Sequence, residues 1–267
     1  GGQNNVALGF KSLSGVASDR NTAVGSYSGV GTDSGSTTTA TNNSFLGYAS
    51  GYLNTGSRAT GIGNYTLYQN TGQDNCGIGY YALHYNSSGT YNTALGAFAL
   101  EKNTTASNNT AVGNWALGLA TSPTASHNTA IGWVALYNNQ ASYGTALGYE
   151  ALRFNTTATN NTALGSQAGK MLSDPGANSN TAVGNRAIGI GTTGTANTAV
   201  GNYALRNNIA NYNVAFGNYA LEANTSGTDN TALGCFASER GTTASYNTAV
   251  GKYANFENLT GSYTNSF

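Results

Sequence analysis

One short sequence unit recurs along the whole chain and limits what the chain can fold into. Neighbouring copies are 16 to 22 residues apart, and most are 16 to 19 apart. Helix-pair repeats need more than about 30 residues and propeller blades about 40, so a unit this short fits one coil of a β-solenoid. The unit is an Asn-Thr-Ala-(Leu/Val)-Gly motif, and its fifteen closing glycines are Gly9, Gly25, Gly47, Gly63, Gly79, Gly96, Gly113, Gly132, Gly148, Gly165, Gly184, Gly201, Gly217, Gly234 and Gly251.

The motif has the alternation of a β-strand, with β-branched and aliphatic residues on either side of a small one. An aromatic residue and Ala-Leu often follow the glycine, and they predict a second short strand; a helical turn is the alternative, because Ala and Leu favour helix. We therefore expect an all-β protein, an oligomeric parallel β-solenoid (β-roll) of about fifteen coils of 16–19 residues. The copies cover residues 1–267 without a change of composition, which predicts a single repeat domain. Its ends carry no visible cap, so we expect it to be cut from a longer repeat array.

The pattern around each closing glycine also predicts an inside and an outside. We expect the aliphatic residue just before the glycine and the Leu four residues after it to fill the interior. The Ala two residues before the glycine would then face outward with the glycine, as a stripe almost without side chains. Such a stripe lets another backbone approach closely and predicts self-association about a three-fold axis, unless tight corners alone require the small residues.

An asparagine column is the most regular polar feature of the repeat. Asparagine tolerates left-handed backbone at a turn, and its amide can bond the backbone or the asparagine one coil away. We expect a structural role for this column. It stands four residues before the glycine in thirteen of fifteen copies: Asn5, Asn21, Asn43, Asn75, Asn92, Asn109, Asn128, Asn161, Asn180, Asn197, Asn213, Asn230 and Asn247.

Composition excludes several classes of function. Only 7% of residues are charged and the formal net charge is zero, so the chain lacks the basic surface that binds nucleic acid. No apolar run approaches the roughly 20 residues of a membrane-spanning helix, so no membrane insertion is expected. Cys76 and Cys235 have neither metal-site spacing nor a disulfide framework.

Residues suited to catalysis or metal binding are scattered. His84 and His127 fall in different coils and predict solvated loop histidines. Asp19, Asp74 and Asp229 each bring a single carboxylate to their turns, whereas calcium needs several oxygen ligands. We expect no catalytic residue, no metal and no cofactor.

Two sets of residues are candidates for surface roles. Nine sequons make candidate glycosylation sites of Asn42, Asn64, Asn86, Asn103, Asn108, Asn155, Asn160, Asn224 and Asn258. An aromatic column two residues after the glycine could stack on sugar rings. Its candidate binding surface consists of Tyr65, Trp115, Tyr203, Tyr219 and Tyr253.

The units at residues 21–25, 109–113 and 230–234 resemble two families of fibrous proteins. They are similar to the Asn-Ser-Val-Ala-Ile-Gly units of trimeric autotransporter adhesin heads, and still more to the Asn-Thr-Ala-Leu-Gly arrays of phage and viral tail-fibre proteins. The resemblance implies a parallel β-roll, trimeric in the adhesins, that serves as a stalk or receptor-binding head. The unit here is longer than the 14–15 residues of the adhesin head.

Together these patterns predict a structural or adhesive fibre segment on the outside of a cell or on a virion surface, and not an enzyme. Its expected partners are further copies of itself, as a trimer or a filament, and a cell-surface carbohydrate or receptor. One alternative is a glycosylated filament subunit that stacks end to end. A less favoured alternative is a solenoid that binds ice or carbohydrate.

Overall fold

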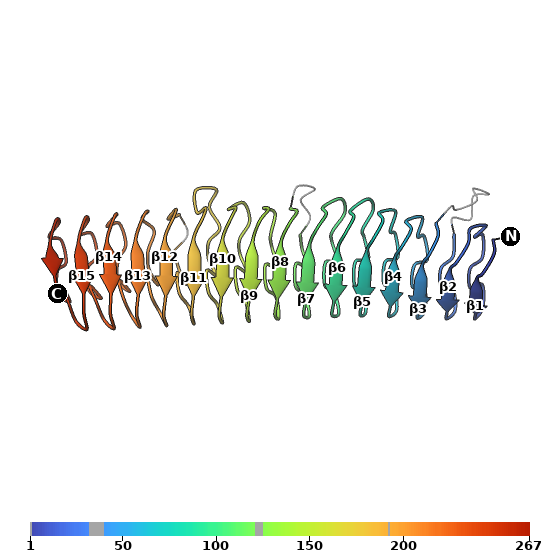
Figure 1. Cartoon of the computed structure of the whole chain (residues 1–267), viewed down its shortest axis with the longest axis horizontal. Coiled ribbons are helices and arrows are strands. Elements are labelled where there is room, and N and C mark those ends of the chain that lie inside the picture. Colours follow the sequence, from blue (N-terminus) through green and yellow to red (C-terminus); the bar gives the residue numbers. More distant parts are fainter. Residues whose placement is uncertain (1, 32–39, 121–124, 192) are drawn as a thin grey trace. The chain divides into compact units, whose positions relative to one another are not determined.

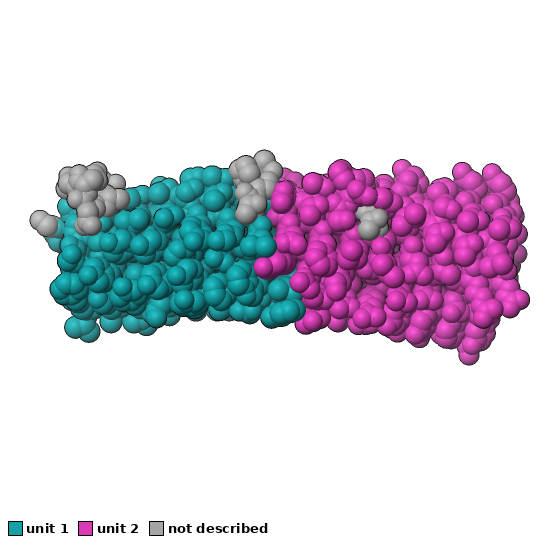
Figure 2. Space-filling view, turned by 180° about the vertical axis from the view of Figure 1, so that it is seen from behind, with its two compact units in different colours: residues 1–134 teal, residues 135–267 magenta. Residues whose placement is uncertain are grey.

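The computed structural model of the chain describes residues 2–31, 40–120, 125–191 and 193–267. It divides into two compact units, unit 1 (Gly1–Val134) and unit 2 (Ala135–Phe267), coloured teal and magenta in Figure 2. Each unit is a parallel β-solenoid in which every coil of about 17 residues contributes one short strand, and the described residues contain no helix. The predicted fold class is confirmed.

Sixteen strands run parallel, eight in each unit, and within a unit they follow one another in chain order (Figure 1). Unit 1 contains β1 (Val6–Leu8), β2 (Thr22–Val24), β3 (Ser44–Leu46), β4 (Thr60–Ile62), β5 (Cys76–Ile78), β6 (Thr93–Leu95), β7 (Thr110–Val112) and β8 (Thr129–Ile131). Unit 2 contains β9 (Thr145–Leu147), β10 (Thr162–Leu164), β11 (Thr181–Val183), β12 (Thr198–Val200), β13 (Val214–Phe216), β14 (Thr231–Leu233), β15 (Thr248–Val250) and β16 (Asn265–Ser266).

The strands turn their middle residue inward. The register of β6 and β7 places Ala94 beside Ala111 and Leu95 beside Val112. Both alanines are 0% exposed, whereas Leu95 is 44% exposed. The prediction that the aliphatic residue before the glycine fills the interior is therefore wrong, and so is the outward Ala stripe. The self-association inferred from that stripe needs a different surface.

The reason for this inversion is lack of room inside the coil. In most coils a Leu four residues after the glycine comes from the opposite arm and is buried, as predicted; Leu83 and Leu100 are 0% exposed. A β-carbon added to Gly77, the middle residue of β5, would already lie 2.7 Å from Thr66 Cγ2 and 3.4 Å from Leu67 Cγ. Beside Thr66 even a methyl group would clash, and in coils such as those of Ala94 and Ala111 the space between the arms holds one buried methyl group at this position.

In one coil of unit 1 a large side chain points inward, and the opposite arm carries glycine in place of Leu. Phe45 takes the inward position of β3 and is 3% exposed. Its ring fits because Gly29 and Gly51 occupy the positions that carry Leu in other coils. A β-carbon on Gly51 would lie 2.5 Å from the Phe45 ring. Volume is therefore conserved across the interior even where the repeat pattern changes.

The segment after each glycine is not a second strand. Tyr81 and Leu83 have left-handed backbone, with φ of 59° and 52°. The Tyr81 N–H donates to the Asn64 carbonyl of the preceding coil at 3.1 Å, and the Leu83 N–H donates to the Ala99 carbonyl of the next coil at 3.0 Å. The arm is bonded from coil to coil like a sheet, yet it is a series of turns. Both the predicted strand and the helical alternative are wrong.

The closing glycine is required by its own backbone and by the next coil. Gly96 has a φ of 135°, outside the range that residues with a β-carbon readily adopt. A β-carbon there would lie 2.6 Å from the carbonyl oxygen of Gly113, the glycine of the next coil. Positive φ and close stacking therefore both require glycine at this position.

Candidate functional surfaces

The predicted asparagine column lies inside the coils and pairs with the backbone. Asn92 is 0% exposed, and its side-chain oxygen accepts the backbone N–H of Asn109 in the next coil at 3.0 Å. Its amide nitrogen donates to the Ala106 carbonyl at 2.9 Å. The left-handed residue is the one before the column, such as Asn108 with a φ of 60°, and not the column itself. We call these residues the backbone-pairing Asn column.

A second asparagine column, which the sequence analysis missed, stands seven residues after the glycine. In unit 1 the amide of Asn70 donates to Asn54 Oδ1 at 2.6 Å, Asn86 donates to Asn70 at 2.6 Å, and Asn103 donates to Asn86 at 2.7 Å. Each also donates to a carbonyl of its own turn, as Asn103 does to Ala106 at 3.0 Å. We call this set the side-chain Asn column. The sequence could have revealed this column, because asparagine stands seven residues after the glycine in nine of the fifteen copies.

The side-chain Asn column changes the interpretation of the sequons. Four candidate glycosylation sites belong to it and are at most 1% exposed: Asn86, Asn103, Asn155 and Asn224. A buried amide that already donates hydrogen bonds leaves no room for a glycan, so the folded chain excludes these four. Glycosylation stays a prediction for half-buried Asn258 and for the exposed Asn42, Asn64, Asn108 and Asn160.

The outward residues of the strands form the most regular surface of each unit. We call the first and third residues of β1–β15 the strand face; most are a Thr and an aliphatic residue. Leu8 is 67% exposed, Leu46 50% and Leu233 46%, and the neighbouring threonines are exposed or half-buried. No residue of β1–β15 is charged. Each unit thus displays parallel columns of hydroxyl and aliphatic groups without any charge.

The aromatic candidates stack on one another. In unit 2, Tyr203 and Tyr219 have ring centroids 5.2 Å apart and planes 17° apart. Phe236 continues the stack 5.3 Å from Tyr219, and Tyr253 follows 5.1 Å from Phe236 with planes only 6° apart. Both faces of Tyr219 are covered, which leaves its edge for other contacts.

The two candidates of unit 1 are also in contact with other rings. Trp115 stacks on Phe98 with centroids 4.3 Å apart and planes 7° apart. Tyr65 lies tilted against Tyr81 at 5.1 Å. Sugar binding by these rings stays a prediction, and the stacking limits it, because sugars bind to open ring faces.

His84 is not the solvated residue that its loop position predicts. It is 6% exposed, and its Nδ1 lies 2.9 Å from the Tyr65 carbonyl oxygen. Its ring stacks on Tyr81 at 4.3 Å and on Tyr68 at 5.0 Å. Burial lowers the pKa of His84, and the hydrogen bond with Tyr65 offsets this only in part. His127 is exposed, as predicted.

The groups that could ligate a metal are scattered in the part of the chain that the structure describes. No group of three or more His, Cys, Asp or Glu residues that could hold a metal ion occurs among the described residues. Cys76 and Cys235 are free and half-buried. Within the described ranges, no helix is long and apolar enough to cross a membrane.

No family model matches the chain, and the search of curated proteins found no match either. The structure shows a parallel β-solenoid of about fifteen turns with asparagine ladders.

Proposed function

We propose that this chain is a structural and adhesive fibre segment that assembles with copies of itself through the strand face. The observation that carries the proposal is the uncharged face itself, with aliphatic side chains such as Leu95 and Leu164 more than 40% exposed along both units. Contiguous apolar surface of this kind on a folded protein marks an interaction site.

The chemistry of the strand face suits an identical partner. When two copies of one face meet, each charge meets its own sign, which opposes association. A face without charge avoids that cost. Threonine hydroxyls both donate and accept hydrogen bonds, so one Thr column can bond a second one. Aliphatic columns lose water when they meet, at about 25 cal/mol per Å².

The size of the strand face is also adequate. Unit 1 contributes eight strands to this face and unit 2 contributes seven. With strands about 4.8 Å apart and three residues of about 3.3 Å each, the face covers roughly 400 Å² in unit 1 and roughly 330 Å² in unit 2. Each unit therefore supplies somewhat less than half of the roughly 800 Å² per partner of a standard protein–protein interface, so both faces are needed.

The resemblance to adhesin heads and tail-fibre arrays adds the rest of the proposal. Trimers are the assembly of the adhesin heads, so we propose a homotrimer. The location that follows is a virion surface or the outside of a cell, with the turns presented to a receptor. No catalytic activity is proposed, since function in those families is carried by surfaces.

Light scattering of the purified chain tests the assembly. A trimer has three times the chain mass of 27.2 kDa. The double variant Leu95→Glu/Leu164→Glu places one carboxylate on the strand face of each unit, and we expect it to be monomeric with an unchanged circular dichroism spectrum. The matched control, Thr105→Glu/Ser226→Glu, adds the same charge at exposed turn residues and should remain trimeric.

Each outcome decides the proposal. A wild-type monomer at tens of micromolar, or a face variant that stays assembled, would overturn self-association through this face. A stable dimer dissociated by the face variant would keep the face and overturn the trimer. Long filaments unaffected by the face variant would favour the end-to-end alternative.

A second function is favoured by the outward direction of the Thr column. Thr93, Thr145 and their counterparts point to solvent at the strand spacing, as an ice-binding surface requires. Only one hydroxyl column is present, since the other outward column is aliphatic. Thermal hysteresis of a monomeric chain, abolished by Thr93→Lys/Thr162→Lys, would support this function in place of assembly.

A further inference from the structure

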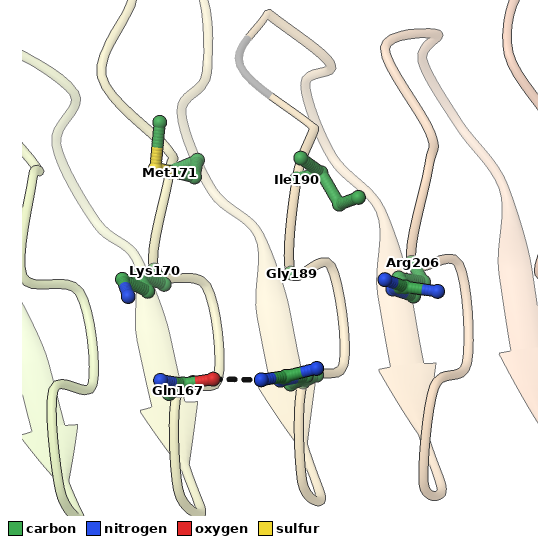
Figure 3. Close-up of a pocket in the computed structure, with 7 residues that line it drawn as sticks. Gln167, Lys170, Met171, Gly189, Ile190 and Arg206 are labelled. Atoms are coloured by element: carbon green, nitrogen blue, oxygen red, sulfur yellow. Dashed lines mark hydrogen bonds between the residues drawn. The ribbon is translucent and has the colours of Figure 1, made fainter.

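Unit 2 carries a notch in the column of residues five positions after the glycine. Most coils place a large side chain there, as with Lys170 and Arg206. The coil between them has Gly189, so a space opens that is one coil wide (Figure 3). Its volume is about 240 Å³. We call it the Gly189 notch.

The notch is bordered by positive charge. Lys170 and Arg206 lie on either side of Gly189 (Figure 3), and Arg186 also lines the space. Lys170 Nζ is 2.7 Å from a Glu150 oxygen, and Arg206 Nη1 is 3.2 Å from a Glu222 oxygen. These two flanking cations therefore already have carboxylate partners.

Arg186 differs from its neighbours because it contacts only neutral groups. Its Nε donates to Gln167 Oε1 at 2.6 Å, and its Nη1 lies 3.4 Å from the Tyr203 hydroxyl. Within the described part of the chain it makes no ion pair. Three cations line the notch, Lys170, Arg186 and Arg206. Among the described residues, the ion pairs of this set involve only Glu150, which Lys170 shares with Arg153, and Glu222, so the positive charges outnumber their carboxylate partners.

A chain of hydrogen bonds holds the Arg186 guanidinium in place. Gln167 accepts from Arg186 with its oxygen and donates through its nitrogen to Glu150 at 2.8 Å. Glu150 is 4% exposed. Burial would raise the pKa of Glu150, but hydrogen bonds from Lys170 and Gln167 and the charge of Lys170 hold it below the ordinary value. The acceptor at the base of the chain is thus an ionised carboxylate at neutral pH.

We propose that the Gly189 notch binds a carboxylate-bearing sugar residue, with Arg186 as the group that pairs with the carboxylate. A guanidinium is a planar fork that matches a carboxylate with two parallel hydrogen bonds, and preorganisation by Gln167 lowers the cost of ordering it. The notch is smaller than most drug-sized sites, so it admits a single sugar ring.

The upper wall of the notch favours a ring over a bare anion. Met171 and Ile190 lie above Lys170 and Gly189 (Figure 3), and Ile190 is 48% exposed. Their side chains offer apolar surface to the C–H face of a ring whose carboxylate lies at Arg186. This inference gives a ligand class to the adhesive part of the proposed function, and it does not depend on assembly.

Titration with glucuronate, followed by NMR chemical shifts or calorimetry, tests the inference. We expect saturable binding that weakens as sodium chloride rises from about 50 to 500 mM, because the contact is ionic. Glucose, which lacks the carboxylate, should not bind. Acetate, which lacks the ring, should bind at least tenfold more weakly.

Two variants locate the site. Arg186→Gln removes the pairing group from a half-buried surface position and should weaken glucuronate binding at least tenfold. Arg240→Gln removes one positive charge elsewhere on unit 2, from a pair with Glu257, and should change affinity less than twofold. Light scattering of both variants should match the wild type, so failure here is distinct from failure of assembly.

Four results would overturn the inference. They are equal binding of glucose and glucuronate, equal binding of acetate and glucuronate, undiminished binding in folded Arg186→Gln, and no glucuronate binding up to about 50 mM.

Discussion

The two asparagine columns use one side chain in two ways. In the backbone-pairing column, the Asn92 oxygen accepts a backbone N–H of the next coil. In the side-chain column, the Asn86 oxygen accepts the amide of another asparagine, Asn103. The first column is present in thirteen of fifteen copies and the second in nine. The difference shows which hydrogen bonds the fold can lose. A buried backbone N–H remains whatever the side chain, so it always needs an acceptor. An asparagine side chain brings both its donor and its acceptor, so an apolar residue can replace it together with both groups.

The interruptions of the side-chain column support this interpretation. Buried oxygens without a hydrogen-bond partner are found on Asn103, Asn155 and Asn224. Each is the last member of a run, because the next coil carries no asparagine at this position. The replacing residues are Ala120, Leu172 and Gly241. Each break therefore leaves one unpaired acceptor, a cost that the fold accepts in this column.

Asn92→Ala should have the largest effect on stability. It removes the acceptor of the Asn109 N–H, which stays buried, while the Ala106 carbonyl keeps its bond from Asn103. An orphaned buried donor plus the lost hydrogen bonds should cost about 3 kcal/mol. Equilibrium unfolding in guanidinium chloride, followed by circular dichroism, measures it. Thr105→Ala on the exposed turn is the control, with a change below about 0.5 kcal/mol. Equal losses in both variants would show that the column contributes no special stability.

Leu172→Asn should have the next largest effect. It tests whether continuing the side-chain Asn column stabilises the fold more than the packing of Leu172 does. The substitution gives the Asn155 oxygen a donor. Leu172, however, fills the space left by Gly169, where a β-carbon would lie 3.1 Å from Leu172 Cδ1. Losing the buried Leu costs more than one hydrogen bond returns, so we expect a net loss of about 2 kcal/mol. Unfolding in urea measures this loss. A gain in stability would mean that Leu172 does not stand in this column to fill the space left by Gly169.

Asn103→Ala should cost less, about 1 kcal/mol. Asn103 ends its run, so its removal takes away one unpaired oxygen and leaves another on Asn86. The number of unsatisfied groups stays constant, and only the bonds that Asn103 donated are lost. The same unfolding assay applies. A loss as large as that of Asn92→Ala would abolish the distinction between the two columns.

The sequence predicted the parallel solenoid and the structural role of the backbone-pairing column because each depends on a strict local pattern. It could not show which side of the strand faces inward. Alternation only separates two faces, and the larger aliphatic residues such as Leu95 would ordinarily be placed inside. The decision comes from the opposite arm, where Leu83 and Leu100 fill the coil and leave room for a methyl group.

The side-chain column and the Gly189 notch were missed for different reasons. The column lies within the segment of variable length, and its members Asn86, Asn103, Asn155 and Asn224 also fit the sequon pattern. The notch requires three consecutive coils to be compared, because the gap at Gly189 acquires meaning only from Lys170 and Arg206 beside it. Spatial neighbours in a solenoid are about 17 residues apart, beyond any local motif.

Gly241→Asn should have the smallest effect and the opposite sign. Gly241 breaks the side-chain column between Asn224 and Asn258, and Ser238 stands where most coils have Leu, so a small cavity lined by these residues remains. Here no neighbour fills the space as Leu172 does. A β-carbon at Gly241 would lie 3.2 Å from the Asn258 carbonyl oxygen, a tight contact that a small shift relieves.

The new amide of Gly241→Asn can donate to the Asn224 oxygen, which has no partner, and its oxygen can accept from Asn258. We expect a gain of about 0.5 kcal/mol in the free energy of unfolding, because the tight contact of the new β-carbon offsets part of the hydrogen bonds gained. Gly241→Ala is the matched control, because it introduces the same β-carbon without the amide. If the Asn variant is no more stable than the Ala variant, joining the two runs has no value, and the interruptions of this column are neutral rather than tolerated costs.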